Sequence, residues 1–410
     1  MTAEITAPRR ERLAALLSDG EHVIVFANTQ GKLQKFSQDK NFLYLTGLNH
    51  PELIYVAGKF GGRFNEMLFI ERSDPERIVW EGEKLDAKEA TGISGIQRVR
   101  YLDEFYPTLS AMCPFMQVIH ANLGFAGLNQ PPTLAMHMLQ PVRDRHPQIQ
   151  INQLNDLIAP LRKLKDAWEV KQLQKAIDIT GQGIEDIVGS ATAGMMEYKL
   201  EATLFYRMQV SGLQAWGFSP IIAAGINAAT LHYEKNNCRV GENELVLMDV
   251  GADCNGYSAD ITRCFPSGRK FTARQKQIYS LVLEVQKEVI AAVKPGVTLS
   301  ELNDITKKGL ARGLISLGLI DSEDQVGRYY MHGVSHFLGM DTHDLGGREA
   351  ALEEGNVITV EPGLYLPEES LGVRIEDDVL VTKTGSKVLS AKIPKEIKDI
   401  EKLRRRVNAS

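Results

Sequence analysis

The sequence predicts a two-domain protein of mixed helices and strands, with a smaller α/β domain at residues 1–155 and a larger domain at residues 156–410. The first observation is length, because 410 residues exceed what one hydrophobic core usually holds. The second is the alternation of short strand-like and helical segments in the first domain. The third is a change of pattern after Pro131-Pro132, since sustained helical periodicity begins near residue 155.

The first 155 residues alternate between helix and strand signals. The Gly61-Gly62 pair predicts a hairpin between its flanking strands. No glycine-rich phosphate loop and no dense group of His, Cys and acidic residues occurs here, so we expect no chemistry from this domain alone. The expected helices cover 9–17 and 84–90, and the expected strands cover 22–26, 42–45, 52–59, 64–70 and 117–121.

The second domain begins with helical periodicity from residue 154 to about 188, followed by a helix at 197–211. Two later helices are predicted by capping boxes, in which a Thr and a Gln or Glu three residues further on satisfy the first backbone N–H groups. These boxes are Thr272–Gln275 and Thr298–Glu301. Between the helix pairs, 245–250 and 257–265 predict two strands joined by Asn255-Gly256, which is a hairpin turn signal.

Composition narrows the class of protein. Hydrophobic residues make up 43% of the chain and charged residues 24%, as in soluble globular proteins. The net charge of −5, without a long run of one sign, gives no support for nucleic-acid binding. No run of about eighteen apolar residues predicts a membrane span. Met1–Arg12 lacks the apolar core of a signal peptide, so we expect a cytoplasmic protein.

Two smaller features receive simple interpretations. The four cysteines have no CxxC spacing, and at this chain length they do not indicate a disulfide framework. Cys254 and Cys264 could face each other across the predicted hairpin, but reduced core residues are the favoured interpretation. The basic cluster at residues 404–406 is interpreted as an exposed helix end.

Acidic residues occur where strands should be apolar. Asp249 and Asp260 interrupt the two strands of the hairpin, Glu361 ends the apolar run 357–360, and Glu376 follows Ile375. A buried carboxylate is costly unless it is compensated, and two neighbouring carboxylates repel each other, so a divalent cation would resolve the conflict. Taken alone, Asp249 could cap the turn and Asp260 could be half exposed.

Three of the nine histidines, His332, His336 and His343, lie close together in the sequence. A lone histidine is more often a core or surface residue than a metal ligand, and Glu361 before Pro-Gly could be a turn acid. Jointly, however, four carboxylates and a histidine at strand positions predict an oxygen-rich site for two metals, with Mn²⁺ favoured over thiolate-preferring ions. Two such ions about 3.5–4 Å apart can share a hydroxide and bind a substrate carbonyl. Asp377 and Asp378 are expected to face solvent or to lie behind the ligands.

Residues from about 165 to 385 resemble the pita-bread metallopeptidases, which include methionine aminopeptidase, prolidase and aminopeptidase P. The motifs MDVGADCNGYSADITR, HGVSHFLGMDTHD, TVEPGLY and VRIEDDVLVT carry this resemblance. FSQDKNFLYLTG at residues 36–47 resembles the N-terminal domain of aminopeptidase P. The resemblance implies an α+β fold, in which a C-terminal pita-bread domain with a curved antiparallel sheet follows a smaller N-terminal α/β domain. It also implies a homo-oligomer, either a dimer or a tetramer.

The resemblance implies two divalent metal ions and a ligand set. Asp249 would chelate one ion, and His336 and Glu361 would hold the other. Asp260 and Glu376 would bridge both. A bridging water would be the nucleophile, and Glu361 would also be catalytic by carrying its proton. The implied metal ligands are therefore Asp249, Asp260, His336, Glu361 and Glu376.

Three further histidines, His232, His332 and His343, match accessory catalytic positions of the family. They would contact the scissile carbonyl and the residues beside it and stabilise charge in the tetrahedral intermediate, with His232 and His343 also binding substrate. Arg374 and Tyr365 match positions next to the metals and are assigned to substrate binding. An ordinary surface ion pair for Arg374 and a packed aromatic ring for Tyr365 remain the alternatives.

The resemblance implies an exopeptidase that hydrolyses the bond between an N-terminal residue and a penultimate proline, an Xaa-Pro aminopeptidase. Its substrates would be peptides with proline in second position, with no nucleic acid or membrane as partner. The alternative is an Xaa-Pro dipeptidase, or prolidase, which differs in substrate length. A metal-free relative such as creatinase, or a non-catalytic binding protein, would lack metal ligands, whereas all five positions here hold ligand-type residues. Ser335 in HGVSH and the 36–47 motif favour aminopeptidase P, and methionine aminopeptidase does not need the extra N-terminal domain.

Overall fold

The computed structural model describes residues 1–31, 35–74, 76–213 and 215–405. The chain forms two compact units, Met1–Leu161 and Arg162–Ser410, here called the N-terminal and C-terminal units. They divide within α8 (Leu154–Lys163), whereas the sequence places the boundary at the start of this helix, near residue 155.

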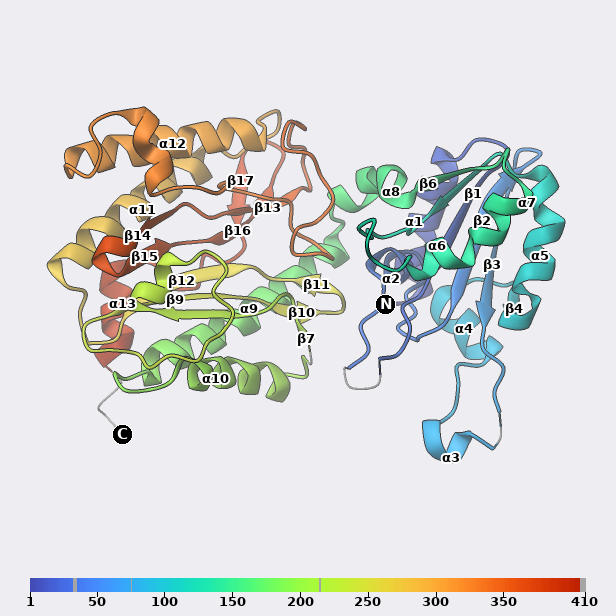
Figure 1. Cartoon of the computed structure of the whole chain (residues 1–410), viewed down its shortest axis with the longest axis horizontal. Helices are drawn as coiled ribbons and strands as arrows, with labels where there is room; N and C mark the ends of the chain where they lie inside the picture. The colour runs from blue at the N-terminus through green and yellow to red at the C-terminus, as the bar shows by residue number, and fades with distance from the viewer. Residues whose placement is uncertain (32–34, 75, 214, 406–410) are drawn as a thin grey trace. The chain divides into compact units, whose positions relative to one another are not determined.

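The N-terminal unit is built on a six-stranded mixed sheet in the order β4-β3-β2-β1-β5-β6 (Figure 1). Phe105 of α5 packs edge-on against Phe26 and Phe69 of the sheet and anchors the core on one face. The strands are β1 (Glu21–Phe26), β2 (Ile54–Phe60), β3 (Arg63–Ile70), β4 (Val99–Tyr101), β5 (Val118–Ala121) and β6 (Gln150–Gln153). The helices before α8 are α1 (Ala3–Leu16), α2 (Lys40–Thr46), α3 (Ile78–Glu81), α4 (Ala87–Ser94), α5 (Phe105–Met112), α6 (Leu134–Met138) and α7 (Gln140–Arg145).

The structure corrects two local predictions in this unit. The strand expected at 42–45 is wrong, because these residues lie in α2. The Asp39 carboxylate accepts a hydrogen bond from Phe42 N at 2.8 Å, and Gly47 ends the helix with a φ of 73°. The helix expected at 84–90 begins later, at Ala87, since Asp86 is its N-cap. The β2–β3 hairpin across Gly61-Gly62 is confirmed.

In the C-terminal unit the strands lie between two helix pairs, α9 with α10 and α11 with α12 (Figure 1). The sheets have the orders β11-β10-β7, β12-β9-β8, β13-β16-β17 and β14-β15. The helices are α9 (Ala167–Ser190), α10 (Glu197–Val210), α11 (Ala273–Ala292), α12 (Leu299–Ser316) and α13 (Ile397–Arg404). The strands are β7 (Ala215–Trp216), β8 (Ile221–Ala224), β9 (Leu245–Val250), β10 (Ala252–Cys254), β11 (Tyr257–Ser258), β12 (Ile261–Pro266), β13 (Val357–Val360), β14 (Gly363–Leu366), β15 (Leu371–Arg374), β16 (Asp377–Val381) and β17 (Ser386–Val388).

The hairpin that the sequence predicts around residue 255 is confirmed. Asn255 and Gly256 both have positive φ, 54° and 88°, which is the geometry of a tight hairpin turn. Beyond the turn, β9 and β12 pair antiparallel with Asp249 opposite Thr262. Both predicted capping boxes are also present, at the starts of α11 and α12. The hairpin therefore brings the acidic residues of both strands to one region of the unit.

The exposed helix end expected at residues 404–406 is wrong for Arg404, which is only 2% exposed. Its guanidinium donates to four backbone carbonyls, those of Val188, Ala191, Ser267 and Gly268. Burial lowers the pKa of Arg404 to about 10. Residue 406 lies outside the described part of the chain.

All four cysteines are free thiols, and Cys238 is the exposed one among them. Cys254 and Cys264 are buried, so the prediction of reduced core residues is confirmed for this pair. Among the described residues, no helix combines the length and the apolar composition that crossing a membrane requires.

Candidate metal centre

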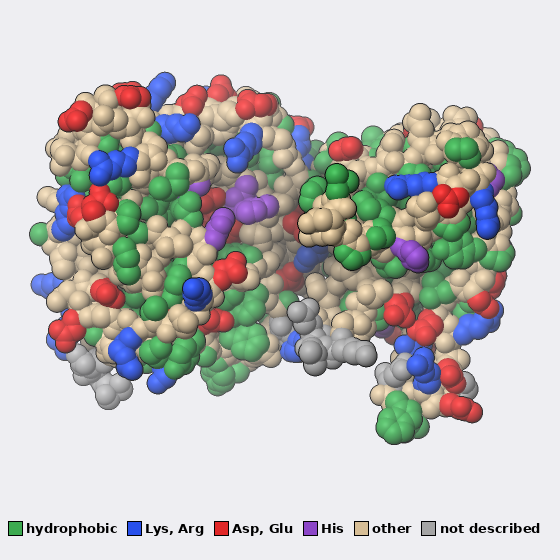
Figure 2. Space-filling view, in the orientation of Figure 1, with side chains coloured by type: hydrophobic (Ala, Val, Ile, Leu, Met, Phe, Trp, Pro, Cys, Tyr) green, Lys and Arg blue, Asp and Glu red, His purple; other side chains and the backbone are tan. Residues whose placement is uncertain are grey.

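The predicted ligands sit at strand ends of the C-terminal unit. Asp249 lies in β9, Asp260 directly precedes β12, Glu361 directly follows β13, and Glu376 lies between β15 and β16. His336 belongs to a loop that an isolated bridge, between Phe337 and Ile358, ties to β13. Figure 2 shows histidine side chains gathered beside acidic ones on one face of this unit.

His336 has a lone pair that faces two acids. Its Nδ1 lies 3.0 Å from Phe337 O, a carbonyl that can only accept, so Nδ1 carries the proton. In the neutral ring Nε2 is then an acceptor, and it lies 3.3 Å from Asp260 Oδ2 and 3.4 Å from Glu361 Oε1. Three acceptors directed at one point need either a proton or a cation between them. Histidines that bind a metal through one ring nitrogen commonly donate from the other nitrogen to a backbone carbonyl, as His336 does here.

Asp260 and Glu376 are 4% and 2% exposed. Burial raises the pKa of Asp260 well above its usual value, and the charges of Asp249, Asp378 and Glu361 raise it further. Burial also raises the pKa of Glu376, reinforced by Asp260 and Glu361. Carboxylates that repel in this way stay ionised together only if a cation compensates them.

Asp249 has one satisfied and one unsatisfied oxygen. Arg374 Nη2 donates to its Oδ2 at 2.7 Å, whereas no donor among the described residues reaches its buried Oδ1. Ligand atoms of Asp260, His336 and Glu376 all lie within 4.8 Å of one another. The unsatisfied oxygen, the mutual repulsion and the donor set of carboxylates with one imidazole fit a hard divalent ion.

Arg374 links the acids to His332. Its Nη1 donates to Tyr365 Oη at 2.8 Å, and Tyr365 Oη lies 2.8 Å from His332 Nε2. Arg374 is 4% exposed and Tyr365 is fully buried, so the alternative of a surface ion pair is wrong. Tyr365 is a packed aromatic ring that also joins this hydrogen-bonded chain.

The three accessory histidines differ in their surroundings. His332 uses both ring nitrogens, since its Nδ1 also lies 2.7 Å from Gly333 O. Burial, together with the charge of Arg374, lowers the pKa of His332 to about 4, so the ring is neutral. A direct contact between His332 and a substrate therefore requires one of these bonds to open. His343 and His232 are exposed instead, and the His343 ring packs edge-on against His336 at 4.3 Å.

Two threonines that we did not single out in the sequence hold the ligands. Thr262 Oγ1 donates to Glu376 Oε2 at 2.6 Å and accepts from Arg374 Nε at 3.2 Å. Thr359 Oγ1 accepts from His336 N at 3.2 Å and donates to Glu361 Oε1 at 3.3 Å. Each threonine lies two positions before or after a predicted acid, which is the spacing of residues on the same side of a strand. This two-residue spacing from a predicted ligand was the feature of the sequence that could have identified both threonines.

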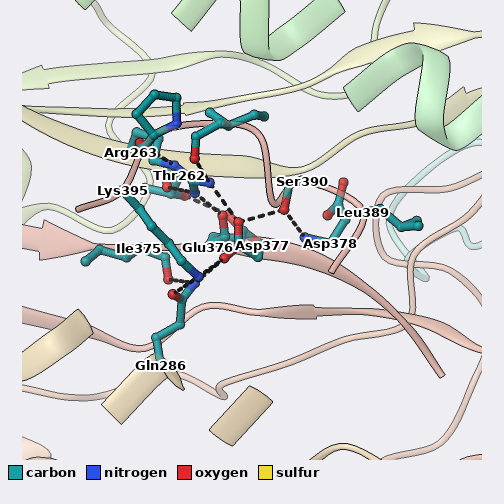
Figure 3. A network of polar contacts seen from close by, with 12 residues as sticks. Thr262, Arg263, Gln286, Ile375, Glu376, Asp377, Asp378, Leu389, Ser390 and Lys395 are labelled. Carbon is teal, nitrogen blue, oxygen red and sulfur yellow. Dashed lines mark hydrogen bonds and ion pairs between the residues drawn. The ribbon is translucent and has the colours of Figure 1, made fainter. Parts of the chain in front are cut away.

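Asp377 and Asp378 do not face solvent, because both are fully buried. Asp377 is the centre of the network in Figure 3, where it pairs with Lys395 and, at 2.7 Å, with Arg263 Nη2. Burial alone would raise the pKa of Asp377, but these two cations hold it well below its usual range. Arg263 Nη1 also donates to Glu376 O at 2.5 Å, so the network supports the backbone of a predicted ligand.

Comparison with known proteins identifies the family. Residues 171–383 match metallopeptidase family M24, and residues 6–117 match the aminopeptidase P N-terminal domain. The chain belongs to metallopeptidase family M24. This confirms the resemblance seen in the sequence, together with the α+β fold class, a pita-bread C-terminal domain that follows a smaller N-terminal domain. Membership of a metallopeptidase family implies divalent metal ions, and Asp260, His336 and Glu376 form a candidate site for them in this chain.

Individual M24 relatives cover nearly the whole chain. The Xaa-Pro aminopeptidase of Haemophilus influenzae is 31% identical, over 96% of this chain and 96% of its own length. A structure described as a candidate aminopeptidase P from Bacillus anthracis is 40% identical with a TM-score of 0.96, covering both chains completely. Aminopeptidase P from Escherichia coli with the inhibitor Pro-Leu is 28% identical with a TM-score of 0.91, again over both complete chains.

Proposed function

We propose that this chain is an Xaa-Pro aminopeptidase that depends on two divalent metal ions and removes the N-terminal residue from peptides with proline in second position. The observation that carries the proposal is the convergence of His336 Nε2 on carboxylate oxygens of Asp260 and Glu361 at 3.3 and 3.4 Å, beside the unsatisfied Oδ1 of Asp249, an arrangement that suits a cation. The names of the relatives support the substrate class, as does the E. coli structure with Pro-Leu, the fragment that cleavage before proline releases from Xaa-Pro-Leu.

In this proposal Asp249 would hold one ion, His336 and Glu361 would hold the other, and Asp260 and Glu376 would be shared by both, with Mn²⁺ as the favoured metal. Bound ions of this kind polarise a carbonyl and lower the pKa of a coordinated water. The bond to proline suits such a site, because proline contributes no N–H and has a fixed φ. An enzyme that must grip the scissile N–H could not use this substrate.

The side chains of the site supply the remaining steps. Glu361 would accept a proton and return it to the departing proline nitrogen, and burial raises its pKa, which favours uptake of that proton. His343 and His232 are exposed, so their ring nitrogens can donate to the substrate carbonyl as negative charge develops on it. Hydrogen bonds between His332 and Tyr365 and between Tyr365 and Arg374 hold the Arg374 guanidinium, which in turn donates to Asp249 Oδ2.

Metal removal tests the proposal directly. Exhaustive chelation is expected to abolish hydrolysis of Xaa-Pro-Yaa peptides, and added Mn²⁺ is expected to restore it, because the acids of the cluster cannot hold their charges together without cations. Metal content by plasma mass spectrometry and turnover by peptide chromatography should fall and recover together. Full activity in metal-free protein would contradict the proposal.

Substrate length and the second residue form a separate test. Xaa-Pro-Yaa peptides are expected to be cleaved much faster than matching Xaa-Ala-Yaa peptides, measured as kcat/KM on the Mn²⁺-loaded enzyme. Comparable rates with alanine would remove the proline claim. Cleavage of an Xaa-Pro dipeptide alone would instead assign the chain as a prolidase, the alternative with the same ligands.

The cytoplasmic location that the sequence predicts and the homo-oligomer that the resemblance implies both stay part of the proposal. Light scattering of the purified protein and fractionation of the source cells test them independently of activity.

A further inference from the structure

Glu197, the first residue of α10, is a fully buried carboxylate whose contacts among the described residues include no cation. Four donors satisfy it instead. Its Oε1 accepts from Ala224 N at 2.9 Å and Asn227 Nδ2 at 3.0 Å, and its Oε2 accepts from Tyr233 Oη at 2.7 Å and Cys238 N at 2.8 Å. The start of a helix also favours a negative charge. All available acceptor positions of this carboxylate are therefore used.

The four donors belong to one segment, residues 224–238, which begins at Ala224, the last residue of β8, and beyond it has no strand and only the short 3₁₀ turn η3 (Gly225–Ala229). Glu197 N also donates to Cys238 O at 2.9 Å, so the carboxylate and its own backbone hold the far end of the segment. A buried charge that needs four donors at once specifies a single geometry more strictly than apolar packing does. Glu197 therefore ties both ends of the segment to the start of α10.

This segment carries His232. The imidazole is exposed, whereas the next residue, Tyr233, is 8% exposed and fixed by its bond to Glu197. The segment also packs on the candidate site, because a Cβ at Gly372 of β15 would lie 1.8 Å from Ala228 O. β15 ends with Arg374, the partner of Asp249. A charge on His232 lowers the pKa of both His332 and His343, in addition to the effect of burial, which is consistent with His232 lying close to both.

We propose that Glu197 and Tyr233 are positioning residues that act through His232. The Glu197 carboxylate fixes the path of residues 224–238, and the Tyr233 hydroxyl passes that constraint to the neighbouring His232, which then meets the substrate with its ring already oriented. The inference rests on the proposed function, in which His232 contacts the substrate. Orientation set before binding matters because a displacement of about 1 Å can lower a rate about 100-fold.

The test is a double-mutant cycle on the Mn²⁺-loaded enzyme. Tyr233→Phe removes only the hydroxyl and is expected to lower kcat/KM for Xaa-Pro-Yaa between about 10- and 100-fold without loss of bound metal. In a His232→Ala background the same change is expected to lower kcat/KM less than about twofold, since the residue it positions is gone. Glu197→Gln should follow the same pattern. Its amide NH₂ group would replace one carboxylate oxygen, and two hydrogen-bond donors of the segment point at each oxygen, so those two bonds would be lost.

Tyr55→Phe is the matched control. Tyr55 is also fully buried and donates to a glutamate, Glu66 Oε2, at 2.9 Å, but it lies in β2 of the N-terminal unit. The Tyr55→Phe variant should change thermal stability while leaving kcat/KM within about twofold of the wild-type value. A second readout is the imidazole NMR signal of His232, assigned with His232→Ala, which should shift or broaden in Tyr233→Phe and not in Tyr55→Phe.

Each outcome is decisive. Wild-type kcat/KM in Tyr233→Phe, or an equal loss in the His232→Ala background, would overturn this inference while leaving the proposed function intact. Wild-type activity in His232→Ala would overturn both the inference and the role assigned to His232. Failure of the wild-type enzyme to cleave any Xaa-Pro-Yaa peptide would overturn the proposed function itself.

Discussion

Replacing Asp260 with alanine is expected to lower kcat/KM by more than about 100-fold, which exceeds the usual loss for residues that merely support a metal ligand. Asp260 Oδ2 lies 3.3 Å from His336 Nε2, and the charges of Asp249 and Glu361 raise the pKa of Asp260 in addition to burial, so its carboxylate lies close to the other candidate ligands. Its removal takes away a bridge in the proposed site. Peptide turnover and metal content, measured on the same preparation, should both fall.

Asp377→Ala is the comparison variant, because Asp377 is equally buried but bonds to Arg263, Lys395 and Ser390 rather than to a candidate ligand. Its loss should appear first in the free energy of unfolding, with metal content close to that of the wild type. Equal effects of the two variants on metal content would contradict the assignment of Asp260 as a bridge.

Features set by neighbouring residues were predictable from the sequence. The Asn255-Gly256 turn and both capping boxes depend on side chains a few residues apart, and the structure confirms them. The acids of the site were visible because a carboxylate in an apolar strand has a large desolvation cost that some partner must offset. The predictions agree with the structure best at positions such as these, where a residue type has a single physical explanation.

Features that depend on distant contacts were not predictable. The apolar run 42–45 is a local exception, because it suits a strand or a helix equally and the Asp39 cap, three residues before Phe42, decides for the helix. In the sequence Arg404 belongs to a basic cluster, and only the fold surrounds it with the carbonyls of residues 188, 191, 267 and 268. Likewise, the bond that occupies His332 Nε2 is made with Tyr365, a residue 33 positions away. Such pairings appear only when the chain is folded.

Asp344→Asn is expected to lower the free energy of unfolding by about 3–5 kcal/mol at neutral pH, the range for breaking a buried ion pair from one side. Asp344 is enclosed by two cations, with Arg162 Nη2 at 2.6 Å and Lys165 Nζ at 3.0 Å, and all three side chains are at most 2% exposed. The variant would leave both cations buried without the carboxylate that balances them. Denaturant titration of wild type and variant, followed by fluorescence, measures the difference.

The matched control is Asp341→Asn. Asp341 pairs with the same guanidinium at the same 2.6 Å, but its side chain is 44% exposed, so its loss should change stability by only about 0–1 kcal/mol. Equal losses in the two variants would mean that burial does not set the strength of these pairs.

The pH dependence of the Asp344→Asn effect tests whether the negative charge of Asp344 stabilises the fold. Burial alone would raise the pKa of Asp344, but Arg162 and Lys165 outweigh it and hold the pKa below its usual value. A carboxyl group with a lowered folded-state pKa stabilises the fold above its unfolded pKa of about 3.9, and this stabilisation is lost as the pH falls toward the folded value. The stability difference between wild type and Asp344→Asn should therefore be complete at pH 7 and shrink below about pH 4. A difference that stays constant down to pH 3 would show that the charge of Asp344 is not what stabilises this part of the C-terminal unit.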